Sequence, residues 1–329
     1  MLKGKKILIT GGTGSLGTAL THRLLKENVS IVRIYSRDEW KQTQMQEKIQ
    51  DKRLRFLIGD VRDRDRLSRA MEDIDVVFHT AALKHVPVAE YNPFEAIKTN
   101  VFGTQNVIES CLDNQVKMAL AIGTDKAVSP LNTYGATKLL MERMFTAANF
   151  YKGAHKTNFL CVRYGNVLGS RGSVVPKFIE QIQKGEKITI TDPRMTRFNI
   201  TMKQAIDLIF RAIKNGKDGE IFIPKLKAYT VDELKNVIIE IVGKKIQVQK
   251  IPVRPGEKFH ETLINKDEIQ YAFESKDDYI IRSPGVETLS DIKSRNLKKV
   301  KFTEPYSSDK VQLIDKQELK NIILKEKLL

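Results

Sequence analysis

The chain has 329 residues, of which 41% are hydrophobic, so it is long enough for one large or two modest domains with a sizeable core. Its formal net charge is +16 at pH 7, but the lysines are scattered and form no basic block interleaved with aromatic residues. This argues against nucleic-acid binding and favours a polyanionic small molecule as partner.

Histidine and cysteine usage gives no sign of a metal site or a disulfide. The five histidines lack ligand spacing. Cys111 and Cys161 both lie in apolar runs, which is typical of reduced, buried thiols. The amino terminus lacks the apolar core of a signal peptide, and no apolar run approaches the length of a membrane span. We therefore expect a cytoplasmic protein without bound metal or membrane span.

The first predicted strand, Lys5–Thr10, leads into a glycine-rich loop and then a helix. The loop reads Gly11-Gly12-Thr13-Gly14-Ser15-Leu16-Gly17. Glycines let the backbone turn tightly and approach a pyrophosphate, and the amino terminus of the helix offers free N–H groups to its phosphates. The order strand, glycine loop, helix predicts dinucleotide binding.

The second predicted strand, Ser30–Tyr35, indicates which dinucleotide is bound. A free ribose 2′-hydroxyl usually meets an acidic residue at this strand tip. Here the tip is Ser36-Arg37, followed by Asp38 and Lys41. A hydroxyl and a cation suit a 2′-phosphate better, which favours NADP over NAD. The alternative for Arg37 is a solvated loop charge.

The next two strands add further cofactor contacts. Leu54–Ile58 is followed by Asp60, which either accepts from the adenine amino group or caps the helix that starts near Asp63. Val76–Phe78 runs toward Ala81-Ala82, small residues that let the backbone pass close under a cofactor. Strands alternating with helices predict an α/β protein with a Rossmann-like, doubly wound parallel sheet.

The sequence pattern changes from Gly169 onward, after the sixth predicted strand, Thr157–Tyr164. We expect residues 1–168 to form an NADP-binding Rossmann domain. Residues 169–329 should form mainly a smaller α/β substrate-binding lobe, interleaved with the first domain. The last thirty residues are lysine-rich with one helix, Lys316–Leu328, and either cross back or make a subunit contact.

Two charged motifs follow the fifth predicted strand, the apolar run from Val116 to Ile122. Thr124-Asp125-Lys126 lies where that strand ends, and Tyr134 and Lys138 share one face of the next helix. Because the carboxyl ends of parallel strands carry the chemistry of α/β folds, we expect these side chains to converge. The alternatives are a surface salt bridge for Asp125 and Lys126, and an ordinary helical pair for Tyr134 and Lys138.

The glycine loop, the Thr124-Asp125-Lys126 motif and the Tyr134–Lys138 pair, together with the short segments given at the end of this paragraph, resemble the extended short-chain dehydrogenase/reductase family. Within it, the chain is similar to the nucleotide-sugar 4,6-dehydratases that act on UDP-N-acetylglucosamine with inversion at C5. Gly123 departs from the pattern, since this family commonly has serine there, although Thr124 still offers a hydroxyl. The segments are Ser36-Arg37-Asp38-Glu39, Asp60-Val61-Arg62-Asp63, Ala81-Ala82-Leu83-Lys84-His85-Val86-Pro87, Glu90-Tyr91-Asn92-Pro93, Thr124-Asp125-Lys126-Ala127, Arg163-Tyr164-Gly165-Asn166-Val167, Ser170-Arg171-Gly172-Ser173-Val174, Met195-Thr196-Arg197-Phe198 and Arg254-Pro255-Gly256-Glu257-Lys258.

The resemblance implies a lyase that oxidises the sugar at C4, eliminates water across C5 and C6, and returns hydride to C6. Tyr134 would take the C4 hydroxyl proton, with Lys138 favouring the phenolate and holding the nicotinamide ribose. Thr124 would share the hydrogen bond to the C4 oxygen. Lys126 would be the C5 base, its pKa lowered by burial, and Asp125 would help the C6 hydroxyl depart. Lysine at position 126 is what implies inversion.

The implied ligands are a UDP-sugar and a tightly bound NADP that is regenerated in each turnover, and the family implies a homo-oligomer. Substrate contacts implied are Lys84, Asn166, Arg254 and Glu257, the last two with a solvated charged loop as the alternative. The residues expected to contact the cofactor are Gly11, Thr13, Gly14, Ser15, Leu16, Gly17, Ser36, Arg37, Asp38, Lys41, Asp60, Val61, Ala81, Ala82, Lys84, Tyr134 and Lys138.

Two other functions compete with the dehydratase. A UDP-N-acetylglucosamine 4-epimerase would use Tyr134 and Lys138 without elimination. A non-enzymatic NADP-binding regulatory protein would need neither Tyr134 nor Lys126.

Overall fold

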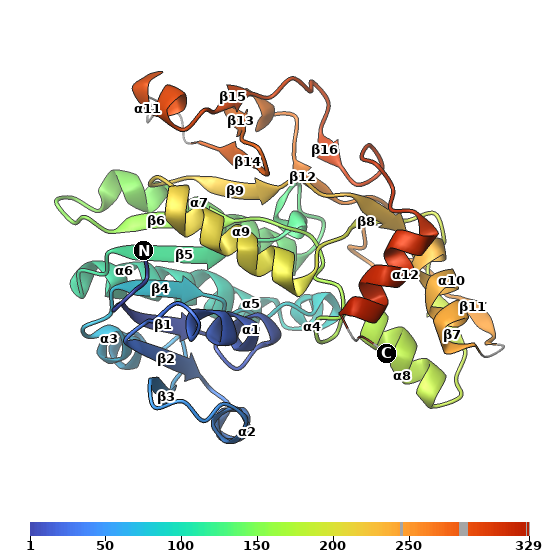
Figure 1. The fold of residues 1–329 in the computed structure, drawn as a ribbon, viewed down its shortest axis with the longest axis horizontal. Helices are drawn as coiled ribbons and strands as arrows, with labels where there is room; N and C mark the ends of the chain where they lie inside the picture. The colour runs from blue at the N-terminus through green and yellow to red at the C-terminus, as the bar shows by residue number, and fades with distance from the viewer. Residues whose placement is uncertain (244–245, 283–288, 327, 329) are drawn as a thin grey trace.

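The computed structural model describes residues 1–243, 246–282, 289–326 and 328. A ten-stranded sheet forms its centre (Figure 1). Its parallel strands are β1 (Lys6–Thr10), β2 (Ile31–Ser36), β3 (Leu54–Ile58), β4 (Val76–His79), β5 (Met118–Ile122), β6 (Asn158–Val162) and β9 (Ile221–Pro224). Antiparallel strands extend it on one side: β14 (Asp278–Ile281), β13 (Ala272–Glu274) and β15 (Lys298–Lys299).

Helices cover both faces of this sheet. On one face α1 (Ser15–Leu24) packs against α9 (Met202–Asn215), and on the other α3 (Arg64–Met71), α6 (Gly103–Asp113) and α7 (Thr133–Tyr151) pack in sequence. The remaining helices are α2 (Glu39–Lys48), α4 (Val86–Tyr91), α5 (Pro93–Ile97), α8 (Val174–Gln183), α10 (Val231–Val242), α11 (Leu289–Ser294) and α12 (Lys316–Lys325). The predicted α/β class and doubly wound parallel sheet are confirmed.

The strand order fixes where a ligand binds. It reads β15-β13-β14-β9-β6-β5-β4-β1-β2-β3, so the chain runs outward from β1 to β3 and then returns to place β4 on the other side of β1. Such a reversal opens a crevice at the carboxyl ends of the two central strands. The glycine loop after β1 and the segment after β4 both lie there.

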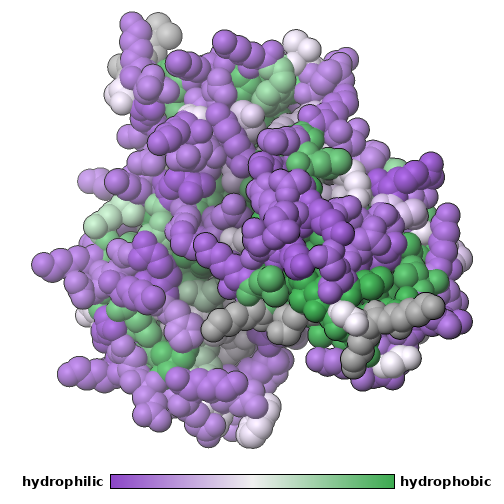
Figure 2. All heavy atoms as spheres, turned by 45° about the vertical axis from the view of Figure 1, so that its right-hand side comes forward, coloured by the Kyte–Doolittle hydropathy of each residue, from purple (hydrophilic) through white to green (hydrophobic). Residues whose placement is uncertain are grey.

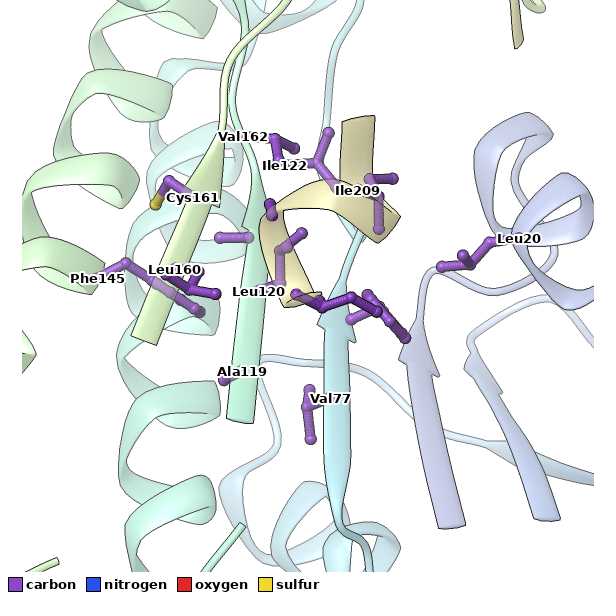
Figure 3. Packing of buried hydrophobic residues seen from close by; sticks show 14 of the residues in the cluster. Leu20, Val77, Ala119, Leu120, Ile122, Phe145, Leu160, Cys161, Val162 and Ile209 are labelled. Carbon is purple, nitrogen blue, oxygen red and sulfur yellow. The ribbon is translucent and has the colours of Figure 1, made fainter. Parts of the chain in front are cut away.

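The main core lies between the sheet and its two helical layers. Leu120, Leu160 and Val162 project from β5 and β6 and are fully or nearly fully buried. Phe145 of α7 and Ile209 of α9 pack in the same cluster (Figure 3). Cys111 and Cys161 are both free and buried in this core.

The second half of the chain also builds a smaller lobe. Three two-stranded sheets are formed by β7 (Ile188–Ile190) with β11 (Val248–Lys250), β8 (Thr196–Phe198) with β10 (Ala228–Thr230), and β12 (Thr262–Ile264) with β16 (Tyr306–Ser307). Helices α8, α10 and α12 share a separate apolar core in this lobe. On the side that carries the lobe, hydrophilic residues cover much of the surface and a band of hydrophobic residues runs between them (Figure 2).

The last thirty residues pack on the smaller lobe: β16 pairs with β12 and α12 packs on α10. The predicted end of the final helix includes residue 327, which lies outside the described residues. Within those residues, every helix is too short or too polar to cross a lipid bilayer.

The helical segment that runs from Pro93 to Asp113 contains a π-helical turn, Lys98–Phe102, between α5 and α6. The wider turn directs Asn100 inward, where its side chain accepts from Leu83 N at 2.8 Å and donates to Leu83 O at 2.9 Å. Asn100 also donates to the Thr137 hydroxyl of α7 at 2.9 Å. This irregularity therefore ties the segment after β4 to the helix that carries Tyr134 and Lys138.

Candidate active site

The glycine loop is built for close approach. Gly11 has φ +66°, and a Cβ atom there would lie 2.8 Å from the backbone of Ala81. A Cβ on Gly17 would lie 2.5 Å from Gly12 O, so α1 also packs directly on the loop. Gly14, before α1, has no side chain to cap the helix, which leaves the first-turn N–H groups available to an anion. These residues fit the pyrophosphate of a dinucleotide.

The tip of β2 carries the predicted adenosine-side residues. Asp38 is the N-cap of α2, since its carboxylate accepts from Lys41 N at 3.0 Å and pairs with Lys41 Nζ at 2.5 Å. Ser36 accepts from Thr13 Oγ1 at 3.2 Å, and Arg37 has about half of its side chain exposed. The Asp38 carboxylate at this tip is therefore already engaged, and Ser36, Arg37 and Asp38 all line the cavity.

Asp60 lies at the tip of β3 and is held by arginines. It accepts from Arg62 through N, Nε and Nη2 at 3.0, 2.9 and 2.7 Å, and Arg37 lies 3.6 Å away. Burial acts to raise the pKa of Asp60, but these arginines hold it below its ordinary value. The N-cap of α3 is Asp63, which accepts from Arg66 N at 3.0 Å. The interpretation of Asp60 as a helix cap is therefore wrong.

A second loop, residues 169–173, crosses in front of the glycine loop. Arg171 donates to Thr13 O at 2.6 Å and to Ser15 Oγ at 3.2 Å. Lys84 Nζ donates to Arg171 O at 2.7 Å. The loop thus places a guanidinium beside the expected pyrophosphate position. Arg171 belongs to one of the motifs on which the family resemblance rests, Ser170-Arg171-Gly172-Ser173-Val174, but it was not among the predicted site residues.

The amino-terminal end of α7 packs closely against the turn that carries Lys126. A Cβ on Gly135 would lie 2.2 Å from Lys126 O, so only glycine lets the helix approach this closely. Asn132 caps the helix by accepting from Gly135 N at 2.8 Å, and it donates to Gly256 O at 2.9 Å. Tyr134, between Asn132 and Gly135, is consequently held beside Lys126.

Lys126 is surrounded by oxygen atoms. Its Nζ donates to Asp125 Oδ1 and to Asn166 Oδ1, each at 3.0 Å. Glu261 Oε1 lies 3.4 Å from the same nitrogen. Thr124 Oγ1 donates to Asp125 Oδ1 at 3.0 Å. Because Asp125 is fully buried and the Lys126 side chain is only 19% exposed, the pair is not a surface salt bridge.

The charge of Lys126 differs from the expectation. Burial alone lowers the pKa of its ammonium, but the Asp125 and Glu261 carboxylates outweigh burial and hold the pKa above its ordinary value of 10.5. Lys126 is therefore protonated at neutral pH. The prediction of a lowered pKa is wrong because it considered burial without the two carboxylates, of which Asp125 has the larger effect.

Tyr134 and Lys138 are both shifted toward their neutral forms. Burial raises the pKa of Tyr134 to about 12, and the strongest opposing charge is that of Lys126. Burial lowers the pKa of Lys138 from 10.5 to about 8, against the nearby Glu142 carboxylate. Without a bound cofactor, the cation that favours the phenolate most is thus Lys126, whereas the sequence pattern pointed to Lys138.

The predicted substrate contacts lie on the lobe side of the same cavity. The loop 254–258 folds back on itself, with Arg254 N donating to Glu257 Oε2 at 3.3 Å. Arg197, on β8, lies 3.5 Å from Glu257 Oε1 and 3.9 Å from Glu261 Oε1. Arg197 and Glu261 are the main residues that sequence reasoning left out of the site. In the sequence, Arg197 lies within the motif Met195-Thr196-Arg197-Phe198, and Glu261 lies three residues after the motif that ends at Lys258.

One cavity of about 980 Å³ contains the whole arrangement. Within the described residues it is lined by every predicted cofactor and substrate residue and by Thr124, Lys126, Tyr134 and Lys138. Asp125 is the exception, because it is buried behind Lys126. Its carboxylate reaches the cavity through Lys126 and Thr124, both of which donate to its Oδ1.

The fold and the site define a class of protein. A doubly wound sheet with a glycine loop after β1 and a Tyr-x-x-x-Lys pair on the helix after β5 is the arrangement of the extended short-chain dehydrogenase/reductase proteins. Residues 7–283 match the family model described as "Polysaccharide biosynthesis protein", and the chain belongs to this family.

Similar proteins carry two different activity names. A UDP-N-acetylglucosamine 4,6-dehydratase (inverting) of Campylobacter jejuni is 46% identical over 333 residues, which cover 98% of this chain and 98% of the relative. A UDP-glucose 4-epimerase of Rickettsia rickettsii is 39% identical over 329 residues, 98% of this chain and 96% of the relative. The X-ray structure of Pen from Bacillus thuringiensis, 45% identical, superposes with a TM-score of 0.95 over 100% of both chains.

Proposed function

We propose that this protein is a UDP-N-acetylglucosamine 4,6-dehydratase that inverts C5. The observation that carries the proposal is the lysine at position 126, held by Asp125, Asn166 and Glu261 beside Tyr134 in one cavity. An alcohol oxidation needs Tyr134, whereas an elimination also needs a second proton-transfer group. The dehydratase relative at 46% identity supports the same conclusion.

The proposed cofactor is NADP, held tightly through each turnover. The glycine loop and the first turn of α1 would hold the pyrophosphate, with Arg171 beside it, and Ser36 and Arg37 would hold the 2′-phosphate. When bound, the nicotinamide supplies the reversible hydride transfer at C4 and C6. Mass spectrometry of the nucleotide released on denaturation tests this choice, and release of NAD alone would contradict it.

The residues of the chain supply the proton transfers. Tyr134 takes the proton of the C4 hydroxyl, and Thr124 on the facing turn shares the hydrogen bond to that oxygen. Lys138 lines the cavity next to Tyr134 and holds the nicotinamide ribose. Lys126 takes the proton from C5 once the 4-keto group has made it acidic. Because Lys126 starts as an ammonium, it must first give up a proton.

The UDP-sugar would bind between the two halves of the molecule. Arg254 suits the diphosphate through its bidentate fork, and Lys84 adds a second cation on the opposite wall. Asn166 and Glu257 accept or donate at sugar or ribose hydroxyls. We propose that residues 1–168 bind NADP and that residues 169–329 supply most of this substrate-binding lobe.

We also propose that the protein is a homo-oligomer. Large apolar side chains are exposed along α4 to α7, where monomeric proteins rarely gather them. Phe94 is 58%, Phe102 55%, Leu140 49% and Tyr151 50% exposed. Helices α5 and α6 both pack beside α7, so these residues lie on neighbouring elements.

The proposed function is tested by incubating the protein with UDP-N-acetylglucosamine and measuring the product by mass spectrometry. Loss of one water is expected. Tyr134→Phe should abolish all turnover. Lys126→Met should stop the loss of water but still permit oxidation at C4, seen as reduced nicotinamide. Lys235→Met is the matched control, because Lys235 is similarly sheltered (14% exposed) but pairs with Asp232 on α10.

A 4-epimerase is the second candidate, supported by the Rickettsia relative at 39% identity. It would give a product of unchanged mass with the C4 configuration reversed. In that case Lys126→Met would retain activity, because an epimerisation at C4 removes no proton from C5.

A further inference from the structure

Glu261 is a buried carboxylate in the cavity wall that the proton transfers above leave unused. It is 3% exposed and lies directly before β12. Ser308 fixes its backbone on both sides: Glu261 N donates to Ser308 Oγ at 2.9 Å, and Ser308 N donates to Glu261 O at 2.8 Å. Within the described residues, Glu261 Oε2 has no hydrogen-bond partner. Such an atom is costly to bury, which indicates a role beyond stability.

Lys126 requires a neighbour that accepts its proton. Only a neutral amine can remove a proton from C5, whereas Lys126 is held as an ammonium. Asp125 and Glu261 are the carboxylates that lie within 4 Å of its Nζ among the described residues. Asp125 is fully buried, its Oδ1 accepts from both Thr124 and Lys126, and its Oδ2, like Glu261 Oε2, has no hydrogen-bond partner among the described residues. Glu261 lines the cavity and therefore faces the reaction.

We propose that Glu261 holds the proton that Lys126 must give up, so that the Lys126–Glu261 pair is the proton-transfer unit for C5 and C6. This inference rests on the dehydratase function proposed above. Glu261 acts through Lys126 and is in that sense a positioning residue. The contacts that hold it come from Ser308, which assigns the carboxyl-terminal segment a part in building the site.

The proposed steps balance in protons and electrons. First an Nζ–H bond of Lys126 breaks, and the proton moves to Glu261 Oε1. The neutral amine then takes the C5 proton, the C5–H electron pair becomes the C5=C6 double bond, and the C6–O bond breaks. The pair now holds one proton in excess. Lys126 gives one proton to the departing hydroxyl, which leaves as water, and Glu261 then returns the proton it held to Lys126, so that both residues regain their starting charges.

Charged side chains surround the Lys126–Glu261 pair, and the proposed proton transfer takes place within the pair. Arg197 on β8 and Lys258 in the preceding loop supply positive charge to Glu261, and Asp125 supplies negative charge. The titratable hydroxyls facing Lys126 are Tyr134 and Tyr229. Because the proton moves within the pair, the net charge of this cluster does not change. The elimination rate is therefore expected to be flat with pH near neutrality.

The test compares the wild-type enzyme with Glu261→Gln, which keeps the shape of the side chain but cannot accept the proton as a carboxylate does. C5 deuterium incorporation from deuterated water should fall by about 100-fold or more. C4 oxidation in a single turnover should persist, which also shows that the variant is folded. The residual elimination should rise with pH, since solvent hydroxide must then deprotonate Lys126. Glu261→Asp should recover part of the rate.

An infrared measurement reads the proton directly. On addition of UDP-N-acetylglucosamine, the wild type should show the carbonyl stretch of a protonated carboxylic acid, and Glu261→Gln should not. The matched control is Glu220→Gln, which also alters a buried carboxylate paired with arginine, 2.6 Å from Arg295. It should leave C5 exchange unchanged.

Three results would overturn the inference: wild-type C5 exchange in Glu261→Gln, equal loss of C4 oxidation and C5 exchange with an unaltered pH profile, or the same infrared band in both proteins. If the wild type itself neither exchanges C5 nor loses water, the proposed dehydratase function fails instead.

Discussion

Lys138 carries a stability cost that its removal should reveal. The side chain is 4% exposed, and burial lowers its pKa from 10.5 to about 8. At about 1.4 kcal/mol for each pH unit, this displacement costs the charged form about 3 kcal/mol. Lys138→Met replaces the ammonium with an apolar side chain of similar length. Glu142 stays paired, because Arg163 Nη2 lies 2.7 Å from its Oε2.

The expected gain in the free energy of unfolding of Lys138→Met over the wild type decreases as the pH rises. The folded-state pKa of Lys138 lies below that of the unfolded chain, so between about pH 8 and 10.5 the unfolded state binds more protons and wild-type stability rises with pH. Lys138→Met should therefore be more stable than the wild type by about 3 kcal/mol below pH 8. The difference should shrink toward zero as pH approaches 10.5.

Urea unfolding followed by circular dichroism over this pH range measures the difference. Activity should be lost in the same variant, as expected where a functional group is held at a cost in stability. Lys235→Met, which removes a lysine paired with Asp232, is the control and should show no such pH-dependent gain. A Lys138→Met protein that is no more stable than the wild type at pH 7, or equally stabilised at every pH, would refute the reasoning.

Three further predictions concern the fold, the cofactor and the assembly. Gly123→Ser should lower stability by about 1–3 kcal/mol, because a Cβ there would lie 2.1 Å from Glu142 Oε1; an unchanged urea midpoint would contradict this. Arg171→Met should leave the fold intact but let nucleotide escape during gel filtration, seen in the ultraviolet absorbance ratio, and full retention would argue against the assigned contact. Phe94→Asp with Phe102→Asp should convert the oligomer to monomers in light scattering; a persisting assembly would exclude this interface.

Local patterns made much of the site predictable. The glycine loop follows a strand and precedes a helix, so its position relative to β1 and α1 is set by neighbouring residues. Tyr134 and Lys138 share a helix face for the same reason. The parallel sheet then brings their helix and the glycine loop to one edge, which the alternation of strands and helices already indicated.

Contacts between distant segments were not predictable from such patterns. Glu261 reaches Lys126 only because β12 pairs with β16 and Ser308 fixes the backbone of Glu261. Glu261 adds to the effect of Asp125 in raising the pKa of Lys126, and its position beside Lys126 has no local signal in the sequence. Arg171 lies 156 residues from Ser15 in the chain, and no local signal connects them. Gly123 is explained by its space for Glu142, a neighbour visible only in three dimensions.

Product analysis by NMR in deuterated water tests the central claim most directly. The protein is incubated with UDP-N-acetylglucosamine, and the product is examined for dehydration, for deuterium at C5 and for the C5 configuration. A 4-keto-6-deoxy sugar with deuterium at an inverted C5 is the predicted result. A C4 epimer that has kept its water and its C5 proton would contradict the account.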